Sequence, residues 1–355
     1  MDSTKPVITK ETKNKITVDY EGKLTFKERL VKKLTTSNTW IKVAVNIFRF
    51  VLMLGVSYVI LFPFFSKLAG SFMSREDIVD ATVSLIPKHF TLDIYKYIIL
   101  DNRYFEAFLN TLLLSLICAV IQTFVSCLIG YGLAKFKFKL NGLFMVLVIV
   151  TMIIPHSTLE FVMYHRFTYF DIAHIMLFDQ PGIELPGILE LIFGKPLELV
   201  NTFWPFVILS IGGLAFKNGL YIYLMRQFFK GVPDELEESA YVDGSNTFRT
   251  FLQIILPLSV PMMITVFLFS FSWQWTDKFY SNIFFVGADE FKMWTMASIT
   301  NTPIHLKDTA FAGQSLYDTV IRNTAGIMII APLVVMYLFC QKYLVQGIER
   351  SGLVG

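Results

Sequence analysis

Charged side chains are scarce in this sequence, and the motifs of common enzyme classes are absent from it. Asp, Glu, Lys and Arg make up 17% of the 355 residues, whereas hydrophobic residues make up 54%. No Gly-x-x-x-x-Gly-Lys-Ser/Thr phosphate loop occurs, so we expect the chain itself not to bind ATP. His-Glu-x-x-His and Gly-x-Ser-x-Gly are absent too, which removes two further catalytic motifs. We therefore expect no catalytic residue, no metal site and no cofactor in this chain.

Cysteine and histidine are also rare. Cys118, Cys127 and Cys340 all lie in apolar runs, so we interpret them as small core residues and expect no disulfide. The five histidines show no paired ligand spacing. His156 follows Pro155 near the end of an apolar run, and a structural role is favoured there over a ligand role.

Long apolar runs dominate the rest of the sequence. A soluble domain of this length would be more polar, and about 20 apolar residues suffice to cross a bilayer as a helix. We therefore predict an all-α polytopic membrane protein with six transmembrane helices. The expected spans are residues 43–65, 107–133, 143–162 (broken by Pro155), 203–224, 260–279 and 323–343.

The polar segments between these runs suggest the domain organisation. Residues 1–42 form a Lys-rich polar arm, with a short amphipathic helix expected at 26–34. Residues 43–106 hold the first span and an external loop, 107–345 the core domain, and 346–355 a tail. Lys and Arg are enriched in the arm, the AKFKFK segment, the loop at 233–258 and the tail, which places both termini in the cytoplasm. Residues 171–200 then form an external insertion, which we expect to receive a binding protein or to line a vestibule.

One polar segment, residues 233–258, carries an ordered series of helix signals. Pro233 and the acidic residues after it suit the first turns of a helix, where the dipole is positive. Gly244 can adopt the left-handed conformation that ends a helix, and Ser245 or Asn246 can cap the next one. The second helix would be anchored by one apolar face, formed by Phe248, Phe251, Leu252 and Ile255. The pattern predicts two helices joined by a tight turn on the membrane surface.

The spacing inside this segment resembles the EAA loop, the signature of ABC-importer permeases. Glu238-Ser239-Ala240 precedes Gly244, and Ile254, Leu256 and Pro257 follow in register. Ser239 stands where Ala is usual, and both residues are small. In that family the loop is the coupling helix that docks in a cleft of the cytoplasmic ATPase. The resemblance implies an ATPase-coupling role for Glu235, Glu238, Ser239, Ala240, Asp243, Gly244, Leu256 and Pro257.

Other segments resemble the carbohydrate permeases of the maltose-permease type. Residues 85–98 are similar to the segment before the core domain of these permeases, and residues 341–355 to their tail. The resemblance implies the type I importer permease fold and the import of a carbohydrate, expected to be an oligosaccharide, by alternating access. It implies a second homologous permease, two subunits that bind ATP and Mg, and an extracellular solute-binding protein. The expected location is a bacterial cytoplasmic (inner) membrane, in contact with lipids and not with nucleic acid.

Polar residues inside the expected spans are the candidates for a substrate path. Two explanations remain open for each of them. Ser115, Gln122 and Ser126 share a helix face and can instead form interhelical hydrogen bonds. Trp273 and Gln274 can bind sugar or belong to the interfacial aromatic belt, and Lys217 can snorkel or pair. The complete candidate set is Ser115, Gln122, Ser126, Trp273, Gln274 and Asn323.

Alternative functions are separated by particular features. An ABC permease for a non-sugar solute would share the EAA spacing. A secondary transporter would leave that spacing unexplained, and it would usually keep an ionisable residue deep in a span. A membrane-embedded enzyme would need a catalytic pair, and the sequence offers none.

Overall fold

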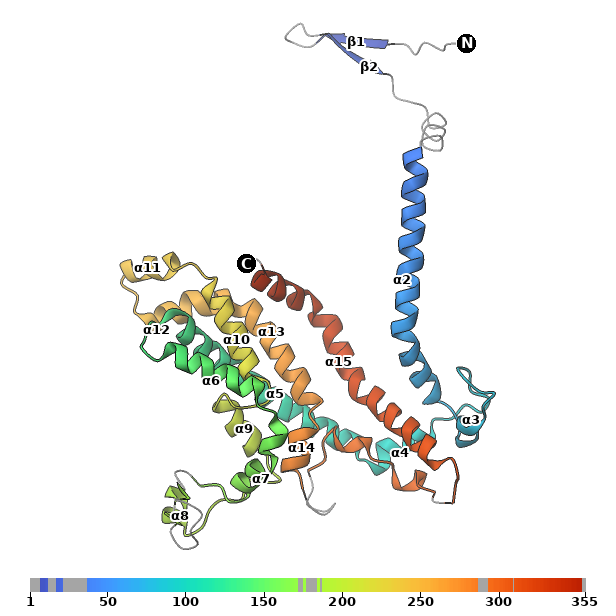
Figure 1. Cartoon of the computed structure of the whole chain (residues 1–355), viewed down its shortest axis with the longest axis vertical. Coiled ribbons are helices and arrows are strands. Elements are labelled where there is room, and N and C mark those ends of the chain that lie inside the picture. Colours follow the sequence, from blue (N-terminus) through green and yellow to red (C-terminus); the bar gives the residue numbers. More distant parts are fainter. Residues whose placement is uncertain are drawn as a thin grey trace. The chain divides into compact units, whose positions relative to one another are not determined.

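The computed structural model describes residues 7–11, 17–21, 37–171, 175–176, 184–185, 187–286, 293–308 and 310–352. By backbone contacts the chain divides into two units, Met1–Ser66 and Lys67–Gly355. Each unit is described by itself below. Figure 1 shows the course of the chain, coloured along the sequence.

The first unit contains a β-hairpin and most of a long helix. Strand β1 (Val7–Glu11) pairs antiparallel with β2 (Thr17–Glu21), with Val7 opposite Glu21. A hairpin is not expected in the polar arm. Both of its strands contain the β-branched residues that favour strands. The amphipathic helix expected at 26–34 lies outside the described residues. Helix α2 (Ser37–Gly70) has apolar residues on all sides and an exposed surface from residue 40 to 65, as expected for a helix covered by lipid.

The second unit is predominantly helical. Its first half holds α3 (Arg75–Val79), α4 (Asp93–Asp101), α5 (Tyr104–Lys135), α6 (Asn141–Ile153), a 3₁₀ turn (His156–Leu159), α7 (Glu160–Thr168), the paired strands β3 (Ile175–Met176) and β4 (Glu184–Leu185), and α8 (Ile188–Phe193). Its second half holds α9 (Trp204–Ile211), α10 (Asn218–Lys230), α11 (Glu235–Val242), α12 (Thr247–Thr250), a π turn (Phe251–Ile255), α13 (Leu256–Trp275), α14 (Phe279–Phe284), 3₁₀ turns at Ser298–Thr300 and Ile304–Leu306, and α15 (Gln314–Gly352).

Helix α5 is the centre of the second unit, because α10 and α13 both pack along it (Figure 1). Gly130 makes the contact with α10 possible. A Cβ atom at this position would lie 2.7 Å from Cβ of Met225 and 2.9 Å from N of Arg226. Around this contact Cys127, Tyr221 and Met225 are completely buried. The helices therefore approach closely because one residue lacks a side chain.

Four helices in the described part of the chain are long and apolar enough to cross a membrane: Trp40–Gly70, Tyr104–Lys135, Thr247–Trp275 and Gln314–Lys342. The pair Asn141–Ile153 and His156–Thr168 would make a fifth span, bent by 93°. This bend confirms the break expected at Pro155. The fourth span is expected to be one continuous helix at 203–224. The structure instead has α9 and α10 with a break between them. The count of six spans therefore stays a prediction.

The break between α9 and α10 has a local backbone cause. Gly212 ends α9, Gly213 has a φ of 69°, and Lys217 just before α10 has a φ of 63°. Two residues in the left-handed region within five positions are incompatible with a continuous right-handed helix. An apolar stretch long enough to span is thus divided in the middle.

Different segments lie at the two ends of the second unit. Figure 1 places α11, α12 and the end of α15 at one end of this unit, and α7 and α8 at the other. The polar loop at 233–258 and the end of α15 thus lie opposite to α8, which belongs to the expected insertion at 171–200. This arrangement agrees with the orientation expected from the distribution of Lys and Arg.

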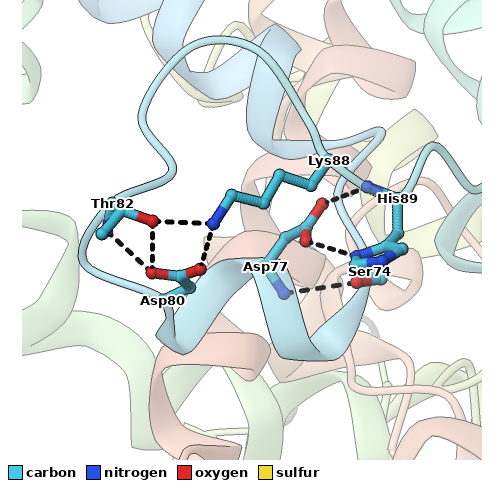
Figure 2. Close-up of polar contacts among 6 residues, drawn as sticks. All are labelled: Ser74, Asp77, Asp80, Thr82, Lys88 and His89. Carbon is cyan, nitrogen blue, oxygen red and sulfur yellow. Dashed lines mark hydrogen bonds and ion pairs between the residues drawn. The ribbon is translucent and has the colours of Figure 1, made fainter.

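The loop after α3 is held by side-chain hydrogen bonds, shown in Figure 2. The buried carboxylate of Asp77 accepts hydrogen bonds from N and Nδ1 of His89 at 2.8 and 2.9 Å. Asp80 accepts from N and Oγ1 of Thr82 at 2.8 and 2.7 Å and from Nζ of Lys88 at 2.6 Å. Every carboxylate oxygen in this cluster has a partner, so the loop has one defined conformation.

Candidate coupling loop and helix-break cavity

The polar loop at 233–258 forms the expected helix–turn–helix. Helix α11 ends at a turn in which Gly244 has a φ of 84°. N of Ser245 donates to the carbonyl of Ala240 at 2.9 Å, which closes the turn. Oδ1 of Asn246 accepts from N of Arg249 at 2.8 Å, so Asn246 is the cap of the next helix. Pro233 lies before the helix, not in its first turn.

The coupling residues expected from the sequence lie mainly on the exposed side of this loop. Ala240 is buried and Leu256 is half-buried; the exposed ones are Glu235, Glu238, Ser239, Asp243, Gly244 and Pro257. Beside them the structure exposes apolar side chains, with Val242 88% and Phe248 69% accessible. Exposed apolar groups next to acidic ones are typical of a surface that another protein covers.

Only half of the apolar face expected to anchor the second helix is buried. Phe251 and Ile255 are buried, but Phe248 and Leu252 are exposed. The π turn at Phe251–Ile255 explains part of the difference. A π turn holds an additional residue per turn, so the regular helical spacing used to define the face no longer applies there.

Lys135 connects the candidate coupling loop at 233–258 to α5, a link that sequence reasoning missed. Its Nζ donates to Oδ1 of Asp234 at 2.5 Å and to the carbonyl of Val232 at 2.6 Å. The hydrogen bond and charge of Lys135 lower the pKa of Asp234. The Lys135 side chain is only 7% exposed. The AKFKFK sequence by itself indicates a uniform basic patch. Its first lysine, Lys135, is instead buried and joins α5 to the start of α11. Only the tertiary packing reveals this, because Asp234 is 99 residues away.

A second connection to the same loop is aromatic. The ring of Tyr131, one turn before Lys135 on α5, lies 4.8 Å from the Phe251 ring and 5.5 Å from the Phe229 ring. All three side chains are buried. Helix α5 therefore contacts both the start of α11 and the π turn that follows the loop.

Gln122 joins three helices in the interior. Its Nε2 donates to Oγ of Ser210 on α9 at 3.0 Å, and its Oε1 accepts from Oγ of Ser270 on α13 at 2.6 Å. All three residues are buried. This geometry confirms the interhelical hydrogen-bonding interpretation of Gln122. Ser115 and Ser126, on the same helix, are fully buried, and their hydroxyls have no partner within the described residues.

The other substrate-path candidates are dispersed. Gln274 is buried, Asn323 is half-buried on α15, and Trp273 is 45% exposed. Trp273 lies beside the helix break, with Nζ of Lys217 at 5.1 Å from its ring centre. Lys217 thus makes cation–π contacts, which is neither of the two alternatives considered for it. The structure does not bring the six candidates into one site.

A cavity of about 250 Å³ lies where the two helix breaks meet. One wall is the bend after α6, with Pro155 and His156, and the other is the break before α10, with Gly213, Lys217 and Asn218. Close approach of the walls depends on Gly219, because a Cβ atom there would lie 2.5 Å from Oγ1 of Thr151. Sequence reasoning found Lys217 and His156 separately but had no signal that would join them.

A larger hollow of about 760 Å³ lies beside the ends of α4 and α15. Four cationic side chains and one carboxylate line it, together with the Trp294 ring and neutral polar groups. The carboxylate belongs to Asp101, which already accepts from N and Nδ1 of His305. The four cations are Arg103, Lys278, Lys307 and Arg322.

Comparison with protein families identifies the family of the chain. The family described as "Binding-protein-dependent transport system inner membrane component" matches residues 126–350. The matched range begins in α5 and ends in α15. It includes the polar loop at 233–258, the cavity at the helix break, and Ser210 and Ser270, whereas their partner Gln122 lies just before it.

Several curated relatives match most of the chain. Protein LplC of Bacillus subtilis is 26% identical over 85% of this chain and 92% of its own length. The arabinooligosaccharides transport system permease protein AraQ of the same organism is 26% identical over 86% and 94%. The polygalacturonan/rhamnogalacturonan transport system permease protein YtcP, also from B. subtilis, is 25% identical over 87% and 97%.

Solved structures show the same fold. A bacterial ABC transporter involved in the import of the acidic polysaccharide alginate matches with a TM-score of 0.60 and 21% identity, over 87% of this chain and 98% of that one. A second alginate ABC transporter structure, in complex with an alginate pentasaccharide-bound periplasmic protein, matches with a TM-score of 0.57 and 14% identity, over 84% and 93%.

Proposed function

The chain belongs to the family of binding-protein-dependent transport system inner membrane components, and from this we propose that it is the permease subunit of an ATP-driven carbohydrate importer. The family consists of transport subunits that are not themselves enzymes. Sugar permeases among the relatives, such as those for arabinooligosaccharides, galactooligosaccharides and alpha-glucosides, support an oligosaccharide substrate. Family membership also favours this function over a secondary transporter.

The exposed face of α11 supports a docking role. Glu235 and Glu238 offer negative charge, and Val242 and Phe248 offer apolar area that the described part of the chain leaves uncovered. We propose that a cytoplasmic ATPase covers this face. The ATPase, and not this chain, then binds ATP and Mg. The partners are then two ATPase subunits, a second homologous permease and a solute-binding protein outside the cell.

Lys135 and Tyr131 provide the mechanical link for alternating access. Both lie in the last turns of α5 and contact the segments that flank α11. A shift of α11 as a rigid body would therefore move α5, because breaking the buried Lys135 contacts would leave a charge without a partner. Helix α5 carries Gln122, which is hydrogen-bonded to α9 and α13. Movement at the loop can thus reach three helices. We further propose six spans, with both termini in the cytoplasm.

The assembly is tested by purification of the tagged chain from native membranes. We expect an ATPase, a second permease and a solute-binding protein to co-purify. The binding protein can then be screened with labelled oligosaccharides. Isolation of the chain alone, or as a homodimer without an ATPase, would count against the proposed function and would restore the secondary transporter as first candidate.

Substitution at Gly244 tests the coupling role. Proline cannot adopt the φ of 84° found there, and its missing N–H removes the hydrogen bond to the Tyr241 carbonyl at 3.0 Å. We expect Gly244→Pro to abolish uptake while the protein still inserts in the membrane. A bulky residue at the buried Ala240 should do the same.

A matched control separates backbone conformation from lost space. A Cβ atom added at Gly244 or at Gly142 would meet no other atom within 4 Å, and only Gly244 has a positive φ. Gly244→Ala should cost about 1–2 kcal/mol in the turn and lower uptake, whereas Gly142→Ala should have little effect. Full uptake by Gly244→Pro in a transport assay would refute the coupling role.

A further inference from the structure

Lys217 is a cation at the break between α9 and α10. Within the described residues, no carboxylate forms an ion pair with it. Instead its Nζ lies 4.9 Å from the centre of the Phe216 ring and 5.1 Å from that of Trp273. An ionisable residue inside a stretch that crosses the membrane is expensive and normally has a functional partner. Two aromatic rings attract the ammonium group, but they leave its positive charge uncompensated.

Asn218 is the second unusual residue at the same position. It is completely buried, and neither Oδ1 nor Nδ2 has a hydrogen-bond partner within the described residues. An amide left in this way lowers stability by roughly 1–3 kcal/mol. It lines the 250 Å³ cavity, so a group held in that cavity can supply the missing hydrogen bonds. Asn218 is thus poised to bind something that enters.

The orientation of α10 adds positive potential. Asn218 is the first residue of this 13-residue helix, so the cavity adjoins its N-terminus. The helix dipole makes such an end favourable for anions, although N of Asn218 and N of Leu220 already donate to the carbonyls of Ala215 and Lys217. Broken membrane helices of transporters direct their N-termini at anionic substrate groups in the same manner. Lys217, Asn218 and the helix end therefore all favour a negative group.

We propose that this cavity is a subsite for the anionic group of the transported sugar, a carboxylate or a phosphate ester. Lys217 supplies the opposite charge and Nδ2 of Asn218 donates a hydrogen bond. The Trp273 ring is not part of the cavity lining, and it contacts the ammonium group of Lys217. The cavity is smaller than the roughly 300–1,000 Å³ of drug-sized ligand sites, which suits one sugar unit. The inference rests on the proposed function and adds the charge of its substrate.

The hollow beside α4 and α15 supports the same substrate class independently. Four cations line it against one carboxylate, Asp101, which accepts hydrogen bonds from His305. One of the four, Arg103, forms an ion pair with Glu106. A concave surface with an excess of one sign of charge concentrates ions of the opposite sign. The Trp294 ring, with the Arg103 guanidinium 5.7 Å from its centre, adds an aromatic face. An anionic oligosaccharide would be attracted here, whereas a neutral one would gain nothing from the charge.

The test uses the complete importer with its binding protein, reconstituted in liposomes. The probes are tri-galacturonate, its methyl ester, a neutral galactotriose and a hexose phosphate. We expect uptake of a charged probe and much less uptake of the neutral ones. Lys217→Met should lower uptake of the charged probe about ten- to a hundredfold, the effect of losing a hydrogen bond to a charged group. Lys217→Arg should retain part of it.

Lys139→Met is the matched control, because Lys139 is an exposed lysine outside the cavity. Asn218→Leu is a second variant that keeps the charge, and ATPase activity of the complex shows that both variants are assembled. Preference for the hexose phosphate over the uronate would support the inference and assign a phosphate. Efficient uptake of galactotriose, unchanged in Lys217→Met, would overturn the inference but leave the proposed function intact. If none of the sugars enters and the binding protein retains a non-sugar solute, the carbohydrate function itself is wrong.

Discussion

Two polar regions of the second unit differ in whether their polar side chains have hydrogen-bond partners. In the loop after α3, Asp77 and Asp80 use both carboxylate oxygens, and Lys88 lies within hydrogen-bond distance of two acceptors (Figure 2). At the break between α9 and α10, Asn218 uses neither side-chain atom within the described residues, and Lys217 faces aromatic rings and no acid. Of these two regions, the one with unpartnered groups adjoins a cavity, and the one whose groups are hydrogen-bonded is a loop.

This difference separates structure from function on physical grounds. A buried polar group that is hydrogen-bonded stabilises one conformation, so the loop needs nothing further. A buried polar group without a partner lowers stability and persists where another benefit outweighs that loss. The break therefore has the character of a site that is completed by its ligand. Substitution distinguishes the two kinds: removal of a hydrogen-bonded group should lower stability, whereas removal of an unpartnered group at the cavity should lower uptake.

The largest expected effect on stability is at Gln122, a satisfied group in the interior. Gln122→Leu would leave the buried hydroxyls of Ser210 and Ser270 without their present partner. We expect the free energy of unfolding to fall by roughly 1–3 kcal/mol, measured by thermal unfolding in detergent. Ser126→Ala is the control, because the Ser126 hydroxyl is buried without a partner among the described residues and its removal should not destabilise. Equal losses in both variants would contradict the distinction.

Asn218 should respond in the opposite direction. Asn218→Leu replaces two unpartnered atoms with a side chain of similar size, so the free energy of unfolding should rise by about 1 kcal/mol. Uptake of the anionic probe should nevertheless fall about tenfold, since a hydrogen bond to the ligand is lost. A variant that is less stable and transports normally would show that Asn218 is an ordinary structural residue, and the comparison with the loop would fail.

The sequence predicts well what depends on local signals. Gly244, Asn246 and the bend near Pro155 act over a few residues, and the structure confirms each of them. The tie between Lys135 and Asp234 and the meeting of the two helix breaks depend on residues far apart in the chain, which no local pattern reveals. The fourth span is predicted as continuous because its composition is apolar throughout, and hydropathy is insensitive to backbone conformation. Lys217 is conspicuous in the sequence, but its surroundings become visible only in three dimensions.

The smallest and most local effect is expected at Asp77. Burial opposes ionisation of this carboxylate, but the two hydrogen bonds from His89 outweigh burial and lower its pKa. The ionised form is therefore favoured by the folded loop. Its stabilising contribution is present above the unfolded pKa of about 4 and is lost as the pH falls through the lower pKa of the folded state. Hydrogen exchange across residues 74–91, corrected for intrinsic rates, should show the loop opening only at such acidic pH.

Substitution makes this test specific to the satisfied network. In Asp77→Ala the His89 N–H loses its acceptor, so the loop should open at neutral pH, with little further change on acidification. Lys88→Met removes an exposed ion pair, which contributes little in water, and should behave like the unaltered protein. Transport should be normal in both variants, because neither residue lies near the helix-break cavity. Loss of uptake in Asp77→Ala with an otherwise folded protein would mean that hydrogen-bond satisfaction alone does not distinguish the two regions.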